Sequence, residues 1–359
     1  MLDRTRPHIA FRPDVLERQA GQTEFTRPIW DYLDITASED RIRKGRRALR
    51  EHRALFNALE ARFGVESEVV AAIWGIETGY GTIRGDVPVL SALATLAWRG
   101  RRAAYFETEF IAALRLVQTG KMRLEEMNGS WAGALGHGQF MPSSILEFAV
   151  DFDGDRRLGL CDDDPTDGLA SIANYLAKHA WKPGQPWGLE VRLPEGFDLG
   201  LTGRDHVAPA SVWAKTGVTA ADGTALPDYG HGSILLPAGA RGPALLVLQN
   251  FHVLTSYNRA DAYAIAVGHL ADRLAGGKPF RQPWPTDEPV LNRAEILELQ
   301  QRLTRAGFDT FGADGLIGRR TRRALRGWQA ARGLPADSHP SAGALAALRA
   351  EQAGERFEP

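Results

Sequence analysis

The chain has a single cysteine, Cys161, among its 359 residues. One cysteine cannot form an internal disulfide, and it excludes every metal or redox site of the CxxC type. The chain also has almost no net charge: 43 Lys and Arg residues oppose 44 Asp and Glu residues, which leaves −1. Because a nucleic-acid-binding chain carries a basic surplus or a basic stripe, we expect no nucleic acid partner.

Long apolar runs are absent as well. A membrane-spanning helix needs about 18 or more consecutive apolar residues, whereas the longest runs here, such as 244–248, have the length of a strand. The sequence begins Met1-Leu2-Asp3-Arg4, with no apolar core of a signal peptide and no nearby cysteine that could carry a lipid anchor. We therefore expect no transmembrane segment, and a soluble form.

Hydrophobic residues make up 44% and charged residues 24%, which is typical of globular proteins. Apolar residues at helical spacing predict mainly α structure up to residue 180. Between 184 and 250, many glycines and prolines separate short β-like runs, which predicts a small β-rich insertion. The predicted helices cover 38–63, 66–76, 90–97, 103–117, 143–150, 167–180 and 259–274, and the β-like runs cover 189–193, 233–237 and 244–249.

Residues 276–290 are rich in proline and glycine and predict an extended linker. Helical patterns follow at 292–306, 321–332 and 341–350, so residues 291–350 predict a small three-helix domain, with a disordered tail at 351–359. The predicted first domain therefore covers residues 1–275, including the insertion.

Glu77 is the strongest candidate for a catalytic residue. It lies four residues after Ile73 and seven after Val70, so all three side chains share one apolar helix face. Burial raises the pKa of a carboxyl group, and a group that stays protonated near neutral pH can act as a general acid. The alternative is a buried structural acid paired with an arginine. The helix is expected to end at the glycines that follow Thr78.

A second conspicuous segment covers residues 130–143, SWAGALGHGQFMPS. Its glycines and other small residues allow close backbone packing, and Gln139 offers an amide next to Pro142, which can open a helix. The alternative is a simple tight loop. His137 alone is more typical of a hydrogen-bonded structural histidine than of a catalyst.

These two segments together resemble the membrane-bound lytic transglycosylase B family, which cleaves peptidoglycan. The resemblance covers roughly residues 25–275 and rests on motifs in matching order: IETGYG at 76–81, RRAAYF at 101–106, GALGHGQFMPS at 133–143, IANY at 172–175, NF at 250–251 and SYN at 256–258. It implies a lysozyme-like α-helical catalytic core.

In that family the glutamate of the first motif is the only catalytic carboxylate, and here it is Glu77. The resemblance implies that Glu77 protonates the glycosidic oxygen between N-acetylmuramic acid and N-acetylglucosamine. It then accepts the proton of the muramic acid C6 hydroxyl, which closes a 1,6-anhydro ring without water or a catalytic cofactor. An ordinary glycosidase needs a second carboxylate, but Glu66 and Glu68 fall on other turns.

The resemblance also assigns residues to the substrate. Ser130 and Gln139 match residues that orient the sugar near the acid. Arg101 and Arg102 match a pair that meets the acidic peptide stem, a role that suits guanidinium groups because they bind carboxylates in pairs of hydrogen bonds.

Three tyrosines match residues that line the sugar cleft: Tyr32, Tyr175 and Tyr257. Sugar rings present CH faces that pack on aromatic rings. Asn258 matches a residue placed to bind an acetamido group. For each tyrosine alone, simple core packing is the alternative.

The acidic loop that starts at Asp151 begins like an EF-hand, with Asp151, Asp153 and Asp155 at positions 1, 3 and 5. The related family carries a similar short calcium loop, so a structural Ca²⁺ is expected, remote from the catalysis. The closing half departs from the pattern, with Asp162 at position 12, and Asp167 is the candidate closing ligand. The alternative is an acidic turn that caps the helix near Asp167.

Residues 291–350 resemble the three-helix peptidoglycan-binding domain of cell-wall hydrolases. The pattern that carries the resemblance, DGLIGRRTRRAL, runs from Asp314, whose turn includes Gly315, to the helix predicted to start at Thr321. The arginines of this helix form either a solvated basic face or a surface that attracts the anionic wall.

The leading prediction is a lytic transglycosylase that acts on peptidoglycan strands. The alternatives are a hydrolytic muramidase and a wall-binding scaffold without turnover, although Glu77 and the glycine-rich segment argue against the scaffold. A periplasmic location follows from the substrate. The sequence contains no GxSxG, Walker A, HExxH or strand-linked GxGxxG motif.

Overall fold

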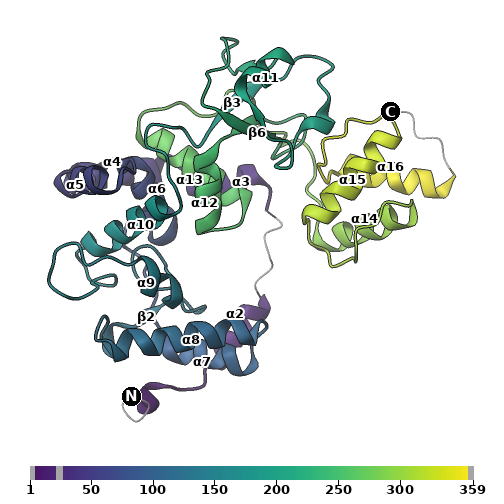
Figure 1. The fold of residues 1–359 in the computed structure, drawn as a ribbon. Coiled ribbons are helices and arrows are strands. Elements are labelled where there is room, and N and C mark those ends of the chain that lie inside the picture. The colour runs from purple at the N-terminus through teal and green to yellow at the C-terminus, as the bar shows by residue number, and fades with distance from the viewer. Residues whose placement is uncertain (1–4, 22–26, 355–359) are drawn as a thin grey trace. The chain divides into compact units, whose positions relative to one another are not determined.

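The computed structural model describes residues 5–21 and 27–354, and these fall into two compact units (Figure 1). The first unit comprises residues 1–23, 36–184 and 253–278, and the second comprises 24–35, 185–252 and 279–359. The protein is mainly α-helical, as the sequence predicts. Within the described residues, the helices are too short or too polar to cross a membrane.

The first unit is built almost wholly from helices. Its centre is α6 (Ser67–Thr78), which packs against α4 (Glu39–Glu51), α10 (Thr166–Lys178) and α13 (Asp261–Leu274). The other elements are η1 (Arg6–His8), α2 (Pro13–Gly21), α5 (Arg53–Phe63), β1 (Val87–Pro88), α7 (Val89–Arg99), α8 (Ala103–Gln118), η2 (Leu124–Glu126), β2 (Asn128–Gly129) and α9 (Pro142–Phe148).

Helix α6 carries a nearly continuous buried surface, with Val70 and Ile73 both inaccessible to solvent. It ends at Gly79, which adopts the left-handed conformation (φ 59°) that glycine tolerates best, and the Gly79 N–H donates to the Gly75 carbonyl. The helical pattern predicts residues 66–76 with a stop at the glycines after Thr78, and the observed helix ends at Thr78. Glu77 therefore lies inside the last helical turn.

Helices α7 and α8 lie side by side (Figure 1), and α8 also packs on α9. The short strands β1 and β2 pair antiparallel, with Val87 opposite Gly129, and this pairing delivers the chain to Ser130. The buried carboxylate of Glu109 on α8 accepts hydrogen bonds from the Ser143 N–H (2.9 Å) and hydroxyl (2.7 Å), which caps the start of α9. The glycine-rich segment is thus fixed at both ends.

One helix prediction is wrong. The single helix predicted for 38–63 is two helices, α4 and α5, which meet at His52. His52 has φ −105° and ψ 25°, outside the helical range, although its N–H still donates to the Ala48 carbonyl. No glycine or proline marks this break, so the sequence pattern runs through it.

The second unit contains the β-rich insertion. Five antiparallel strands lie in the order β4 (Ala208–Pro209), β6 (His231–Leu235), β7 (Ala244–Val247), β3 (Gly188–Arg192) and β5 (Thr219–Ala220). The three longest strands match the predicted β runs. Their core packs Ile234 and Leu246 against Trp213 of α11 (Ala210–Lys215). The unit also holds α3 (Ile29–Thr36) and η3 (Leu199–Leu201), and α12 (Gln249–Tyr257) leads from it into the first unit.

Three helices follow the linker: α14 (Arg293–Arg305), α15 (Arg319–Ala331) and α16 (Ala342–Ala353). They enclose a core that includes Leu299, Leu325, Trp328 and Leu348. Helix α15 begins two residues before the predicted start at Thr321. Helix α16 continues to Ala353, past its predicted end, and residues 355–359 of the predicted tail lie outside the described residues.

Within the second unit, the three-helix module contacts the β-rich insertion directly. The half-buried Arg326 of α15 donates to the carbonyls of Gly200 (3.3 Å) and Thr202, to the Thr202 hydroxyl (3.2 Å) and to the Ser338 hydroxyl (2.7 Å). The linker also contacts the insertion, because the Glu190 carboxylate of β3 accepts the backbone N–H groups of Arg281 and Gln282. The domain division predicted from the sequence stays a prediction, but the insertion and the module group together.

Candidate active site

Glu77 lies half-buried in the last turn of α6, as its helical spacing predicts. The Tyr263 hydroxyl of α13 donates a hydrogen bond of 2.6 Å to Glu77 Oε1. Burial raises the pKa of Glu77 from 4.5 to about 7, and the hydrogen bond from Tyr263 opposes part of that rise. A substantial share of Glu77 is therefore protonated at neutral pH.

Aromatic rings gather beside this carboxyl group. Tyr257 and Tyr263 stack with an interplanar angle of 8° and centroids 6.3 Å apart, and Tyr175 meets Tyr257 edge-on at 4.9 Å. The Tyr257 hydroxyl donates to the Gly138 carbonyl (2.6 Å), and the Tyr175 hydroxyl donates to the Ser256 carbonyl (2.7 Å). Burial raises the pKa of Tyr257, and the nearby charge of Glu77 raises it further. The structure thus brings Tyr175, Tyr257 and Glu77 into one cluster.

The glycine-rich segment packs against these tyrosines, as its small residues predict. A Cβ atom added at Gly138 would lie 2.8 Å from the Tyr257 hydroxyl oxygen and 2.6 Å from the ring of Phe140, so only glycine fits there without rearrangement. Gln139 adopts a positive φ of 49° and donates its amide to the carbonyls of Arg84 (3.1 Å) and Gly136 (3.0 Å). These contacts fix the Gln139 side chain.

Ser130 stands at the other end of the same segment. Its hydroxyl accepts the Ala134 N–H (3.0 Å), and its backbone N–H donates to the Ala134 carbonyl (2.8 Å). Ser130 therefore closes the turn that opens the glycine-rich segment, and its role toward a substrate stays a prediction.

The other predicted substrate residues are Arg101, Arg102, Asn258 and Tyr32. Arg101 and Arg102 are exposed in the turn before α8, where the Arg102 guanidinium lies 4.3 Å from the Tyr105 ring centroid. Asn258 is exposed, and its side-chain oxygen accepts the Ala260 N–H (3.1 Å). Tyr32 is half-buried on α3, in the second unit. The binding roles of all four stay predictions.

Sequence reasoning missed one residue of the site. Tyr263 lies within the predicted helix 259–274 without an assigned role, yet its hydroxyl is the hydrogen-bond partner of Glu77. The only available signal was its position six residues after Tyr257, just beyond the SYN motif. The alternative pairing of Glu77 with an arginine is not what the structure shows.

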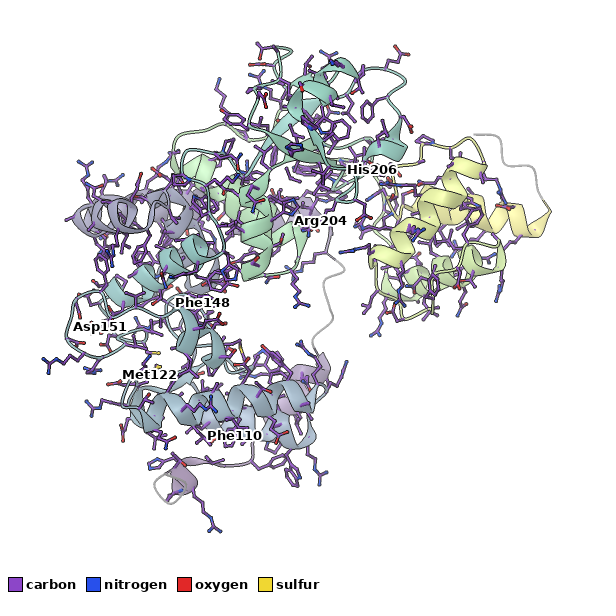
Figure 2. The ribbon with its side chains drawn as sticks, viewed as in Figure 1. Phe110, Met122, Phe148, Asp151, Arg204 and His206 are labelled. Atoms are coloured by element: carbon purple, nitrogen blue, oxygen red, sulfur yellow. The ribbon has the colours of Figure 1, made fainter. Side chains whose placement is uncertain are left out.

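The acidic loop follows α9, and Figure 2 shows Asp151 just beyond Phe148 at the end of that helix. Ligand-type oxygens of Asp151, Asp153 and Asp155 all lie within 4.8 Å of one another. Three carboxylates this close suit a hard cation such as Ca²⁺. These carboxylates also accept hydrogen bonds from the backbone of the loop: Asp151 accepts the N–H groups of Gly154 (2.7 Å) and Arg156 (2.8 Å).

Asp167 has a different place from the three clustered acids. It is buried, and its two oxygens accept the N–H groups of Phe152 (2.7 Å) and Gly159 (2.9 Å), so it braces both arms of the loop. Burial raises the pKa of Asp167. Just before α10, Asp164 accepts the N–H and hydroxyl of Thr166, the first residue of that helix. The role of Asp167 as closing ligand stays a prediction.

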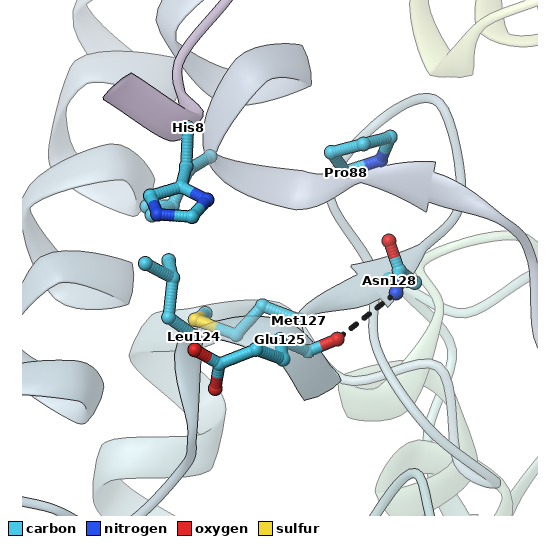
Figure 3. A pocket seen from close by; sticks show the side chains of 7 residues that line it. His8, Pro88, Leu124, Glu125, Met127 and Asn128 are labelled. Atoms are coloured by element: carbon cyan, nitrogen blue, oxygen red, sulfur yellow. Dashed lines mark hydrogen bonds between the residues drawn. The ribbon is translucent and has the colours of Figure 1, made fainter. Parts of the chain in front are cut away.

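A small pocket elsewhere in the first unit contains none of the predicted site residues (Figure 3). Asn128 donates its amide to the Glu125 carbonyl at its edge (3.2 Å). The pocket is lined by His8, Pro88, Leu90, Leu124, Glu125, Met127 and Asn128.

Comparison with known proteins agrees with this fold and site. Residues 1–272 match the transglycosylase SLT domain family, and residues 292–348 match the peptidoglycan binding domain family. The first match covers well over half of the chain. The protein therefore belongs to the lytic transglycosylase family, which confirms the resemblance drawn from the sequence.

Individual relatives extend this comparison. The chain is 43% identical to SltB3 of Pseudomonas aeruginosa, solved in complex with NAG-anhNAM-pentapeptide; the match covers 97% of this chain and 93% of that chain, with a TM-score of 0.92. It is 30% identical to the lytic transglycosylase Slt35 of Escherichia coli, solved in complex with calcium, over 76% of this chain and 86% of that chain (TM-score 0.66).

Among curated proteins, the chain is similar to membrane-bound lytic murein transglycosylase B of Escherichia coli (strain K12). The two are 35% identical over 220 residues, which cover 59% of this chain. The chain spans 58% of the length of that relative.

Proposed function

We propose that this protein cleaves the β-1,4 bond between N-acetylmuramic acid and N-acetylglucosamine in peptidoglycan and leaves 1,6-anhydro-muramic acid ends. The observation that carries the proposal is the environment of Glu77, whose burial raises the pKa of its carboxyl group to about 7. A group with this pKa holds a proton to donate at neutral pH and remains a useful base after donating it.

In the first step, protonated Glu77 gives its proton to the glycosidic oxygen, and the bond from that oxygen to C1 of the muramic acid breaks. The Tyr263 hydroxyl occupies Oε1, which leaves Oε2 to carry the proton. The same hydrogen bond stabilises the carboxylate that results, because hydrogen bonding to an ionised group favours that form.

In the second step, the Glu77 carboxylate accepts the proton of the C6 hydroxyl, and the C6 oxygen bonds to C1. The new bond closes the anhydro ring, and Glu77 is protonated again for the next cycle. No water is consumed, and no cofactor is needed because one residue performs both proton transfers.

The electrostatics favour this route over hydrolysis. Among the described residues, burial and the Tyr263 hydroxyl account for the pKa of Glu77, and no neighbouring carboxylate contributes to it. A hydrolase of the usual kind places a second carboxylate within about 5–10 Å of the first. The related SltB3, solved with an anhydro-muramic acid ligand, supports the same product.

The tyrosine cluster, Ser130, Gln139 and Asn258 are proposed to hold the sugars, with Tyr32 as a further sugar contact. Arg101 and Arg102 are exposed and cationic, which suits the acidic peptide stem. The C-terminal module is proposed to bind the cell wall, and an enzyme with this substrate works in the periplasm. Asp151, Asp153 and Asp155 are proposed to hold a structural Ca²⁺, as the calcium complex of Slt35 supports.

Digestion of purified sacculi followed by mass spectrometry tests the proposed reaction. We expect muropeptides one water lighter than hydrolytic products, and they should resist borohydride reduction because they lack a reducing end. Reducible products would identify a hydrolytic muramidase. An absence of products from folded protein would identify a binding scaffold.

Glu77→Gln is the matched variant for this experiment. The amide has the same shape but cannot supply the proton, and the loss of general acid–base catalysis costs about 10²–10⁴ in rate. Retention of more than about a tenth of wild-type activity would refute the assignment of Glu77.

A further inference from the structure

The imidazole of His137 joins separate segments of the first unit. The Trp74 indole N–H donates to His137 Nδ1 (3.0 Å), and His137 Nε2–H donates to the Asp162 carbonyl (2.9 Å). His137 as a whole is 1% exposed. Because Nδ1 accepts a hydrogen bond, the proton must reside on Nε2 and the ring must be neutral. Burial also lowers the pKa of His137, which keeps the ring neutral at neutral pH.

These contacts reach both sides of Glu77. Trp74 lies three residues before Glu77 on α6, and Thr78 is the residue directly after Glu77. The Thr78 hydroxyl shares its proton between the Trp74 carbonyl (3.1 Å) and the His137 carbonyl (3.2 Å), so His137 contacts α6 on either side of the acid. The His137 N–H also donates to the Leu160 carbonyl (3.0 Å), which ties the same residue to the acidic loop.

The residue after His137 is Gly138, which is the hydrogen-bond partner of Tyr257. The Gly138 carbonyl accepts the Tyr257 hydroxyl (2.6 Å), and Tyr257 stacks on Tyr263, the hydrogen-bond partner of Glu77. A shift of the backbone at 137–138 would therefore move the aromatic side of the site. The ring has little freedom, because a Cβ added at Gly81 would lie 2.8 Å from its Cε1 atom and a Cβ added at Gly168 would lie 3.1 Å from its Cδ2 atom.

We propose that His137 is a positioning residue for the reaction of Glu77: its neutral imidazole fixes the glycine-rich segment against the last turn of α6 and so keeps the tyrosine side of the site closed over the acid. This inference rests on the function proposed above. His137 does not touch the reacting atoms. It acts through Trp74 and Thr78 on α6 and through Gly138 on Tyr257.

The proposal differs from a purely structural role in what it predicts for Glu77. If the segment loosens, water reaches the Glu77 carboxyl and stabilises its ionised form, so its pKa falls toward 4.5. Among the described residues, Tyr263 donates to Glu77 and Tyr257 lies near its charge, and burial raises the pKa of Tyr257 away from neutral pH. A change in the alkaline limb of the pH–rate profile therefore reports on Glu77 itself.

Three variants of the full-length protein test the proposal. His137→Leu removes both ring hydrogen bonds, His137→Asn keeps an acceptor near the position of Nδ1, and Trp74→Phe removes the donor on the other side. Each is assayed for kcat, KM, pH–rate profile and melting temperature on soluble peptidoglycan fragments.

We expect His137→Leu to lower kcat by about a hundredfold, the typical effect of misplacing a catalytic group by about 1 Å. The alkaline limb should move to lower pH by about one unit, with a smaller change in KM. Trp74→Phe should move the limb in the same direction, and His137→Asn should recover most of the loss. A fourth protein that combines His137→Leu with Trp74→Phe should show less than the sum of the two single effects, because both substitutions remove the same Trp74–His137 hydrogen bond.

An unchanged kcat and pH–rate profile, with only the melting temperature lowered, would overturn the proposal and leave His137 a structural residue. If His137→Leu does not fold, the comparison of His137→Asn with Trp74→Phe decides by the same criteria. Failure of the proposed function is distinguishable, because the wild-type protein would then give reducible products or no products, whatever the His137 variants do.

Discussion

Replacing Glu77 with glutamine should stabilise the folded protein in a pH-dependent way. The folded pKa of about 7 lies about 2.5 units above the ordinary value of 4.5, and each unit corresponds to 1.36 kcal/mol. The folded state therefore binds the Glu77 proton more tightly than the unfolded state by about 3 kcal/mol. This contribution is complete below pH 4.5 and is lost as the pH rises through 7.

Glutamine carries no charge at any of these pH values, so Glu77→Gln does not lose that stability. At pH 5 the free energies of unfolding of the variant and the wild type should be similar. At pH 8 the variant should be more stable by about 3 kcal/mol at most, since the Tyr263 hydroxyl can still donate to the amide oxygen. An active-site substitution that removes catalysis would then strengthen the fold.

Urea unfolding followed by tryptophan fluorescence measures the effect, because Trp74 lies on the same helix as Glu77. The curves are recorded between pH 5 and pH 8 for the wild type, Glu77→Gln and Glu107→Gln. Glu107 is an exposed residue of α8, so its substitution should leave the pH dependence unchanged. Parallel pH dependences for the wild type and Glu77→Gln would refute the claim that burial raises the pKa of Glu77.

Three further predictions concern other parts of the molecule. Tyr263→Phe removes a hydrogen bond that favours the ionised form of Glu77, so the alkaline limb of the pH–kcat/KM profile should move to higher pH; a shift to lower pH would contradict this. Arg326→Ala should speed proteolysis within the 279–290 linker and leave cleavage of soluble fragments unchanged, because Arg326 joins the module to Thr202 of the insertion; equal proteolysis rates would exclude this role. Ca²⁺ should raise the melting temperature of the wild type and not that of Asp153→Ala, as binding to the folded loop requires; identical wild-type melts with Ca²⁺ and with a chelator would show an ordinary acidic turn.

The sequence allowed most helices of the fold to be predicted, because each carries a buried stripe and many end at a glycine. Helix α6 combines both signals and was predicted to within two residues of its observed end. The break at His52 could not be predicted, since helix-forming residues continue through it. A helical pattern reports which face is buried, and it does not report whether the backbone bends between two segments that share that face.

The site was predicted unevenly for a similar reason. Glu77 combines an apolar stripe with a motif, so both its burial and its role could be inferred. Tyr263 lies 186 residues further along the chain than Glu77. An apolar helix face indicates that a residue is buried, but it does not indicate which residue it contacts. The arginines of α15 were interpreted as a solvated face or a wall-binding surface; Arg322 and Arg323 are exposed, but Arg326 donates to carbonyls of the insertion. A charge pattern cannot distinguish these cases.

The pKa of Glu77 matters because one carboxyl group must both donate and accept a proton in the proposed reaction. A pKa far below the working pH would leave no proton for the glycosidic oxygen, and a pKa far above it would be costly to the first transfer. Burial raises the pKa of Glu77, and the hydrogen bond from Tyr263 opposes part of that rise, so that the pKa lies at about 7. By lowering the pKa of Glu77, Tyr263 keeps the carboxyl group able to perform both proton transfers. In the proposal above, His137 holds the glycine-rich segment in place, and this segment keeps Tyr257 and Tyr263 packed beside Glu77.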